Sequence, residues 1–183
     1  MNHWQLRRAV ESLKSGGVIA YPTESVFGLG CDPSNLTAID RILSIKNRSY
    51  KKGLIILVND IQQALPLLAP LQPEQIEKIN QKLERATTWL IEKNDKVSSV
   101  LSGEHQKLAV RVTSNPTAKK LCGMFGKPIV STSCNLNTKP ASPRLAEIRN
   151  QFHLKVDQII AGSCCGQPPS QIIDLESDVV LRR

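Results

Sequence analysis

Apolar residues recur along the chain with two different spacings, which together predict a mixture of helices and short strands. Apolar positions three to four residues apart predict amphipathic helices, whereas short aliphatic runs predict strands that are buried on both faces. Residues 54–58, Leu-Ile-Ile-Leu-Val, form the clearest such run. Because helices and strands do not alternate strictly, we expect one α/β domain over residues 1–183, with an open, twisted, mixed β-sheet and flanking helices.

The boundaries of these elements follow from glycine, proline and capping residues. We expect helices over residues 4–14, 60–69, 74–84, 116–122 and 143–152, and a further helix that Ser34 or Asn35 caps and that frays from Lys46 onwards. We expect strands over residues 18–21, 26–31, 54–58, 88–91, 108–113, 128–133, 156–160, 171–175 and 178–182. The polar segment 92–107 predicts a long flexible loop.

The charge balance indicates an anionic ligand or partner. Lys and Arg number 24 against 16 Asp and Glu, which gives a net charge of +8 and a pI near 9.4. Such a balance favours nucleic acid, a nucleotide or both, although scattered basic residues would also serve solubility alone. Aromatic residues make up only 4%, which argues against a base-stacking RNA platform. A non-catalytic module that binds double-stranded RNA or an rRNA precursor remains an alternative, because duplex RNA is recognised by shape and phosphate.

Cysteine usage and the first residues predict a reduced, cytoplasmic protein. The five cysteines are odd in number and form no C-x-x-C motif, although the vicinal pair Cys164-Cys165 would suit a redox or metal site as well as an incidental loop. The three histidines lack zinc-site spacing, so we expect no metal held by the protein. The first 13 residues have no apolar signal core, and no run of about 18 apolar residues predicts a membrane span.

Common catalytic motifs are missing from the sequence. There is no G-x-x-x-x-G-K-[ST] phosphate loop, and Gly28-Leu29-Gly30 lacks the third glycine of a dinucleotide fingerprint. We therefore interpret Gly28 and Gly30 as part of a tight strand connection. No Ser/His/Asp triad follows from the spacing.

Three polar clusters remain, each at the end of a predicted strand or helix. They are residues 22–25, Lys46 with Arg48, and residues 131–135. In an extended segment, the side chains of Ser131, Ser133 and Asn135 point to one side. Because ligands of open α/β sheets gather beyond strand ends, two cations facing hydroxyl and amide groups suit a polyanion with a polar co-substrate.

Each cluster also has an ordinary structural interpretation. Thr23 would simply follow a turn proline, Lys46 and Arg48 would complement a helix dipole, and the serines would be polar strand residues. Spacing alone therefore predicts an anion-binding α/β domain and goes no further.

The same three clusters, in this order, resemble the YrdC-like (TsaC) family of threonylcarbamoyl-AMP synthases. The most specific part is the pairing of K-x-R (Lys46 and Arg48) with S-x-N (Ser133 and Asn135). The matching stretches cover residues 16–33, 45–48, 52–58, 108–116 and 128–137, with a looser match over 168–177 and Arg182. Two local departures are Asn137-Thr138, where the family commonly has Ser-Gly, and the turn at residues 162–166. We expect the short, single-domain form, without the extra C-terminal domain of longer members.

The resemblance implies a sheet wrapped round a large basic cavity, and it implies a reaction. Threonine and bicarbonate would form N-carboxy-threonine, whose carboxylate attacks the α-phosphate of ATP to give L-threonylcarbamoyladenylate and pyrophosphate. Magnesium would bridge the phosphates, and partner proteins would transfer the threonylcarbamoyl group to an adenosine beside the tRNA anticodon. Direct contact with tRNA or double-stranded RNA would suit the net charge.

The resemblance also implies residue roles. Lys46 and Arg48 would be the catalytic residues and would contact the ATP phosphates. The residues expected to bind threonine are Thr23, Ser133 and Ser170. The further residues expected near the nucleotide are Arg111, Ser131, Asn135 and Arg182. A carbamoyl transferase domain within a larger enzyme is a weaker alternative, since the accessory zinc-finger and acyl-phosphatase-like segments of such enzymes are not found.

Overall fold

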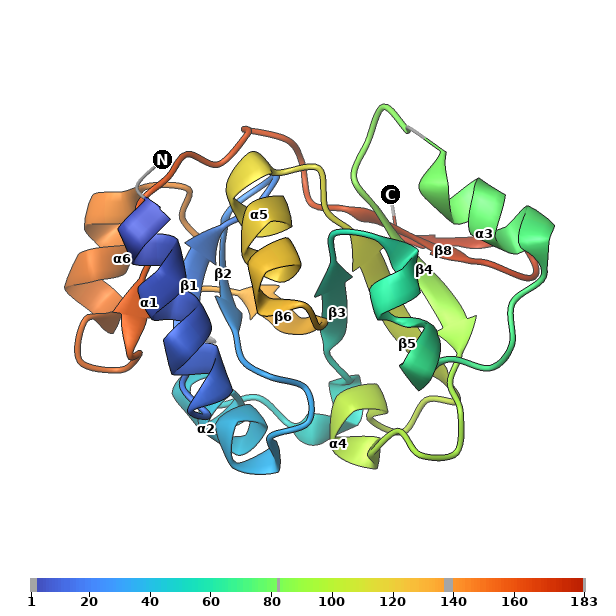
Figure 1. The fold of residues 1–183 in the computed structure, drawn as a ribbon, viewed down its shortest axis with the longest axis horizontal. Coiled ribbons are helices and arrows are strands. Elements are labelled where there is room, and N and C mark those ends of the chain that lie inside the picture. Colours follow the sequence, from blue (N-terminus) through green and yellow to red (C-terminus); the bar gives the residue numbers. More distant parts are fainter. Residues whose placement is uncertain (1–2, 82, 137–139, 183) are drawn as a thin grey trace.

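The computed structural model describes residues 3–81, 83–136 and 140–182, and they fold around one mixed β-sheet (Figure 1). Asn137 and Thr138, where the sequence departs from the resembling family, lie outside the described residues. In the described part of the chain, the sheet has nine strands in the order β7-β1-β2-β6-β3-β5-β4-β8-β9. The strands are β1 (Ile19–Pro22), β2 (Phe27–Gly30), β3 (Ile55–Val58), β4 (Thr87–Glu92), β5 (Lys107–Val112), β6 (Ile129–Ser133), β7 (Gln158–Ile159), β8 (Gln171–Asp174) and β9 (Val180–Arg182).

The sheet is open and mixed, as the sequence predicts. The pairs β1/β7, β3/β5 and β4/β8 are parallel, and the other neighbours are antiparallel. The strands β7 and β9 form the two edges, so the sheet does not close into a barrel. The predicted buried strand is confirmed in β3, where Ile56, Leu57 and Val58 are fully buried.

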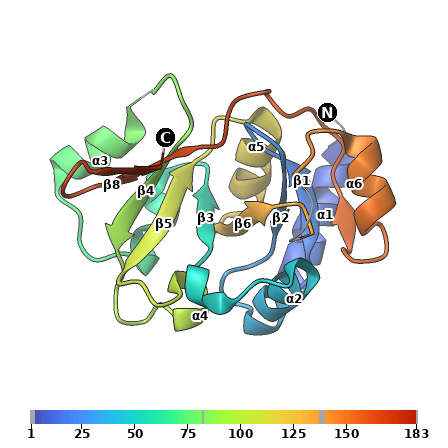
Figure 2. The same cartoon turned by 180° about the vertical axis from the view of Figure 1, so that it is seen from behind.

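Helices cover both faces of the sheet. On one face lie α1 (His3–Lys14) and α5 (Pro116–Phe125), which pack together over Ile19, Leu57 and Ile129 (Figure 1). The larger apolar cluster, on the opposite face, includes residues of α2 (Leu36–Lys46), α4 (Ser99–Ser102) and α6 (Leu145–Phe152) (Figure 2). The remaining helix is α3 (Pro73–Asn80), which lies near β8.

Side-chain caps decide where two helices of the site begin. The Asn35 side chain accepts a hydrogen bond from Ala38 N at the start of α2. The Asn115 side chain accepts from Thr117 N and Ala118 N at the start of α5, whose first residue is Pro116. Both follow the preference of asparagine for the N-cap and of proline for the first helical position.

Two sequence predictions are wrong. Residues 60–69 form two short 3-10 turns, Ile61–Gln63 and Leu65–Leu67, instead of one helix, because Pro66 has no N–H for a continuous α-helix. Segment 92–107 is not a flexible loop, since it includes α4 and buries Val97 and Leu101 against the core.

A long connection, residues 161–170, joins β7 to β8 without regular secondary structure, and we call it the strap. It runs along one end of the sheet from the β7 side to the β8 side (Figure 1). Gly162 lies so close to Pro22 that an added Cβ would be 2.8 Å from Pro22 Cγ. The strap is therefore packed directly against the last residue of β1.

Candidate active site

Lys46 is the last residue of α2 and reaches the S-x-N residues at the end of β6. Its Nζ donates to Ser133 O at 2.5 Å, Asn135 O at 3.1 Å and Asn135 Oδ1 at 2.7 Å. Ser133 Oγ also donates to Asn135 Oδ1 at 2.7 Å. The helix ends here because Asn47 adopts the left-handed conformation, with φ 46°. The lysine of K-x-R and the two S-x-N residues, which are far apart in the sequence, thus share one hydrogen-bonded cluster.

The environment of Lys46 makes its proton easier to lose than usual. The side chain is buried, and this burial, together with the neighbouring charge of Arg48, lowers the pKa of Lys46 to about 8. The ammonium still predominates at neutral pH, where its three protons serve these three oxygens and Ser133 Oγ, which lies 3.5 Å from Nζ.

Arg48 lies on the turn after α2, and the hydrogen-bond donors of its side chain are only partly satisfied. Its Nη2 donates to Gly53 O at 3.0 Å, whereas its buried Nε has no hydrogen-bond partner among the described residues. A buried unpaired donor is costly, so this guanidinium is suited to receive a further acceptor.

Thr23, Tyr21 and Ser131 surround Gly28 on β2. A Cβ added to Gly28 would lie 3.2 Å from Thr23 Cγ2, 3.4 Å from Tyr21 Cζ and 3.5 Å from Ser131 Oγ. The Thr23 hydroxyl donates to Val26 O at 2.7 Å within its own turn, which leaves the hydroxyl oxygen as an acceptor. Gly28 therefore allows these side chains to pack closely against the strand, and it is not part of a dinucleotide-binding loop.

Ser170, the last residue of the strap, and Arg182 on β9 form a second cluster. Arg182 donates from Nη2 to Ser170 O at 2.6 Å and to Ser170 Oγ at 3.1 Å. Ser170 Oγ also lies 2.9 Å from Thr88 Oγ1 on β4. Ser170 is buried, whereas Arg182 is exposed. The contact therefore fixes the guanidinium group of a side chain that solvent still reaches.

Arg111 on β5 lies between these two clusters and faces a buried carboxylate. Its Nε is 4.0 Å from Glu24 Oε2, and neither atom has a hydrogen-bond partner among the described residues. Burial acts to raise the pKa of the Glu24 carboxyl, but the charge of Arg111 and hydrogen bonds from Thr113 and Ser114 outweigh it and lower the pKa. Glu24 is therefore a charged, buried partner of Arg111.

The structure thus brings together several of the residues expected from the sequence. Direct contacts join Lys46 to Ser133 and Asn135, and Ser170 to Arg182. After burial, the nearby charge of Arg111 helps to lower the pKa of Arg182. The Arg48 side chain instead bonds its own segment, with Nη2 donating to Gly53 O.

Three further residues of the site escaped the sequence argument. Glu24 belongs to the first polar cluster, but only its burial beside Arg111 gives it a role. The predicted helix over residues 116–122 begins next to Asn115, but the sequence does not indicate that the Asn115 amide donates to Thr23 O. Thr88 carries no sequence signal, because its contact with Ser170 depends on the pairing of β4 with β8.

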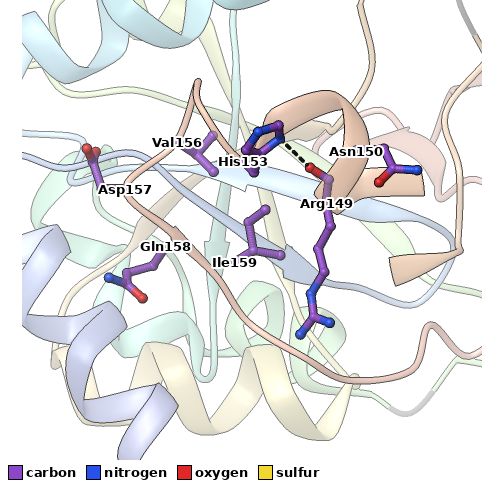
Figure 3. Close-up of a pocket in the computed structure, with 7 residues that line it drawn as sticks. All are labelled: Arg149, Asn150, His153, Val156, Asp157, Gln158 and Ile159. Carbon is purple, nitrogen blue, oxygen red and sulfur yellow. Dashed lines mark hydrogen bonds between the residues drawn. The ribbon is translucent and has the colours of Figure 1, made fainter. Parts of the chain in front are cut away.

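Surface depressions elsewhere involve none of these residues. One of about 480 Å³ is lined by residues of α6, of β7 and of the turn between them, among them Arg149, His153 and Asp157, and His153 Nδ1 bonds Arg149 O (Figure 3). A second, of similar size, lies beside α5 and is lined by residues including Lys119 and Met124.

The cysteines and metal-ligating residues add no second centre. All five cysteines are free, and burial raises the pKa of the Cys122 and Cys134 thiols to about 12. No cluster of three or more His, Cys, Asp or Glu suited to a metal ion occurs within residues 3–81, 83–136 and 140–182. Among the same residues, no helix is long and apolar enough to cross a membrane.

The site residues thus include four cations, two at the end of α2 and one each on β5 and β9, beside several hydroxyls and one buried carboxylate. This arrangement defines a protein that binds anionic, phosphate-bearing ligands together with a small polar co-ligand. Comparison with known proteins gives its family: the Sua5/YciO/YrdC model, described as "Telomere recombination", matches residues 11–183, and the chain belongs to this family.

Relatives and solved structures agree with this assignment. A threonylcarbamoyl-AMP synthase of Saccharophagus degradans is 42% identical over 187 residues, which cover 100% of this chain and 98% of the relative. One of Vibrio parahaemolyticus is 40% identical over 179 residues, covering 96% and 97%. The structure of P. abyssi Sua5 complexed with L-threonine has a TM-score of 0.90 at 29% identity, and the match covers all of this chain and 54% of that one.

Proposed function

We propose that this chain is an enzyme, an ATP-dependent nucleotidyltransferase that makes L-threonylcarbamoyladenylate from L-threonine, bicarbonate and ATP. The observation that carries the proposal is the bonding of Lys46 to Ser133 and Asn135, which joins the family's two most specific motifs in one site. Full-length relatives at about 40% identity bear the name of this activity. Nothing in the fold or in the comparisons favours the alternative of a non-catalytic RNA-binding module.

The reaction explains why the site is rich in fixed cations. The amine of threonine attacks bicarbonate carbon, water leaves, and N-carboxy-threonine forms. An oxygen of its new carboxylate then forms a bond to the α-phosphorus of ATP, while the bond from that phosphorus to the bridging oxygen of the β-phosphate breaks and pyrophosphate departs. Both reactants are anionic, so the protein must neutralise and align them more than it must supply a nucleophile.

We assign the residues according to this division of labour. Lys46 and Arg48 hold the phosphates and the carboxylate of the carbamate, with Arg48 as the planar fork that has an unused donor. Threonine is bound by the hydroxyls of Thr23, Ser133 and Ser170. The nucleotide is bound by Arg111, Ser131, Asn135 and Arg182.

Magnesium enters, in this proposal, as part of the Mg·ATP substrate. Phosphate oxygens and water are the ligands that Mg²⁺ prefers when few carboxylates are at hand, and the described residues offer no acidic cage. The product is consumed in the cytoplasm by partner proteins that transfer the threonylcarbamoyl group to an adenosine beside the tRNA anticodon. A net charge of +8 also suits direct contact with tRNA.

The proposal is tested by mixing the protein with ATP, bicarbonate and threonine and measuring pyrophosphate release. We expect release only when all three substrates are present, together with a new adenylate detected by mass spectrometry. Pyrophosphate release that does not depend on threonine would reject the assignment.

A further inference from the structure

We propose that Asn115 is a positioning residue for substrate threonine, a role that rests on the proposed function and extends it to a residue outside the K-x-R and S-x-N motifs. Asn115 is completely buried between the end of β5 and the start of α5. It therefore touches no substrate and acts through the segments that it joins.

The Asn115 amide group joins two segments that carry expected threonine ligands. Its Nδ2 donates to Thr23 O at 2.9 Å, in the turn after β1, and to Ser163 O at 3.3 Å, in the strap. Nδ2 also lies 3.4 Å from Cys165 Sγ. Thr23 belongs to the first segment, and Ser170 is the last residue of the strap.

The neighbouring carboxylate reinforces the same junction. Glu24 Oε1 accepts from Thr113 Oγ1 at 2.6 Å, Ser114 N at 2.8 Å and Asn115 N at 3.2 Å. The backbone carbonyl of Glu24 accepts from Gln167 N at 3.1 Å, so the strap is joined to the turn once directly and once through Asn115. Since strap residues lack regular secondary structure, these bonds fix the distance between Thr23 and Ser170.

Asn115 has two functions that substitution can separate. Its Oδ1 caps α5 by accepting from Thr117 N and Ala118 N, and its Nδ2 makes the donations to Thr23 and the strap. Serine and aspartate are both good N-caps, but neither can donate as the amide does. In Asn115→Ser and Asn115→Asp the helix cap is kept and the positioning bonds are lost.

The chain offers a matched control in Asn35, which caps α2 through Ala38 N. Asn35→Ser and Asn35→Asp change the same residue type at another helix start, away from Thr23 and the strap. We expect them to leave the KM values for threonine and ATP unchanged.

The test compares both KM values in pyrophosphate release, and threonine affinity by calorimetry. Losing buried hydrogen bonds that set ligand geometry should raise the KM and Kd for threonine about tenfold in Asn115→Ser, and more in Asn115→Asp, where a carboxylate oxygen faces two carbonyl oxygens. The KM for ATP should change less than about twofold, because the lost Nδ2 bonds go to Thr23 and the strap and, among the described residues, to none of the side chains assigned to the nucleotide.

Two outcomes would overturn the inference. One is unchanged threonine affinity in either folded variant. The other is an equal loss for threonine and ATP, which is what general loosening of the fold produces. If Asn115→Ser fails to fold, the isosteric Asn115→Asp decides the question. Wild-type protein that binds threonine but makes no adenylate would reject the proposed reaction and leave this test of Asn115 intact.

Discussion

Replacing Arg48 by alanine should separate the stability of this protein from its turnover. Among the described residues, the Arg48 side chain makes one hydrogen bond, from Nη2 to Gly53 O at 3.0 Å, and its Nε has no partner. Loss of one such bond costs about 1 kcal/mol of unfolding free energy, which corresponds to a fall in Tm of about 2–4 °C for a chain of this size.

The expected effect on catalysis is much larger. If Arg48 fixes the phosphates and the approaching carboxylate, its removal takes away a charged donor that acts on the transition state. Loss of one such donor lowers turnover by about 10²- to 10³-fold, or about 2.7–4 kcal/mol. Arg48→Lys should recover only part of this, because an ammonium cannot reproduce the planar fork.

The assay measures thermal unfolding and threonine-dependent pyrophosphate release on the same protein samples. Lys51→Ala is the matched control: it removes a cation from the same segment, but Lys51 is exposed and pairs with Glu104 on the surface at 2.7 Å. Such surface pairs contribute little, so this variant should keep wild-type turnover. A folded Arg48→Ala protein with wild-type turnover would refute the catalytic assignment.

Three further predictions concern the substrate, the thiols and pH. Valine, which lacks the threonine hydroxyl, should be discriminated against by up to about 10⁴-fold in kcat/KM, and comparable turnover of the two amino acids would exclude a site that reads the hydroxyl. Changing Cys164 and Cys165 to serine should leave turnover intact, and loss of activity with an unaltered fold would mean that a thiol takes part. The affinity for ATP, measured by calorimetry from pH 7 to 10, should weaken as pH rises through about 8, because burial lowers the pKa of Lys46 to that value; Lys46→Arg should lack this step. The lowered pKa also affects stability. Between about pH 8 and 10.5, Lys46 binds fewer protons in the folded state than in the unfolded state. Its contribution to the free energy of unfolding should therefore rise over this range while the affinity for ATP falls.

The sequence predicts the open mixed sheet and most of its strands because aliphatic runs and glycine or proline boundaries are local signals. Strand alternation also places Ser131, Ser133 and Asn135 on one side without knowledge of the fold. The predictions that are wrong concern segments in which the local hydrophobic pattern competes with another structural constraint. Residues 60–69 have helical spacing, but Pro66 interrupts the hydrogen bonds.

The parts of the site that the sequence could not predict depend on strand order. Thr88 meets Ser170 because β4 pairs with β8, and nothing local in either strand specifies the other. The buried pair of Glu24 and Arg111 likewise needs the end of β1 to lie beside β5 in space. Asn115 shows the same limit, since its capping role is local and its bonds to Thr23 and Ser163 are not.

The position of the strap has a consequence for how the molecule assembles. It connects β7, at one edge of the sheet, to β8, next to the other edge. Two strands that are consecutive in the sequence therefore lie near opposite edges of the sheet. Gln171 bonds Thr87 across a sequence separation of 84 residues, and contacts of this range close late because loop entropy must be overcome first. Ser170 and Arg182 should therefore take their places after the central strands have formed. A refolding experiment that follows ATP binding beside backbone structure should show the binding signal arriving last.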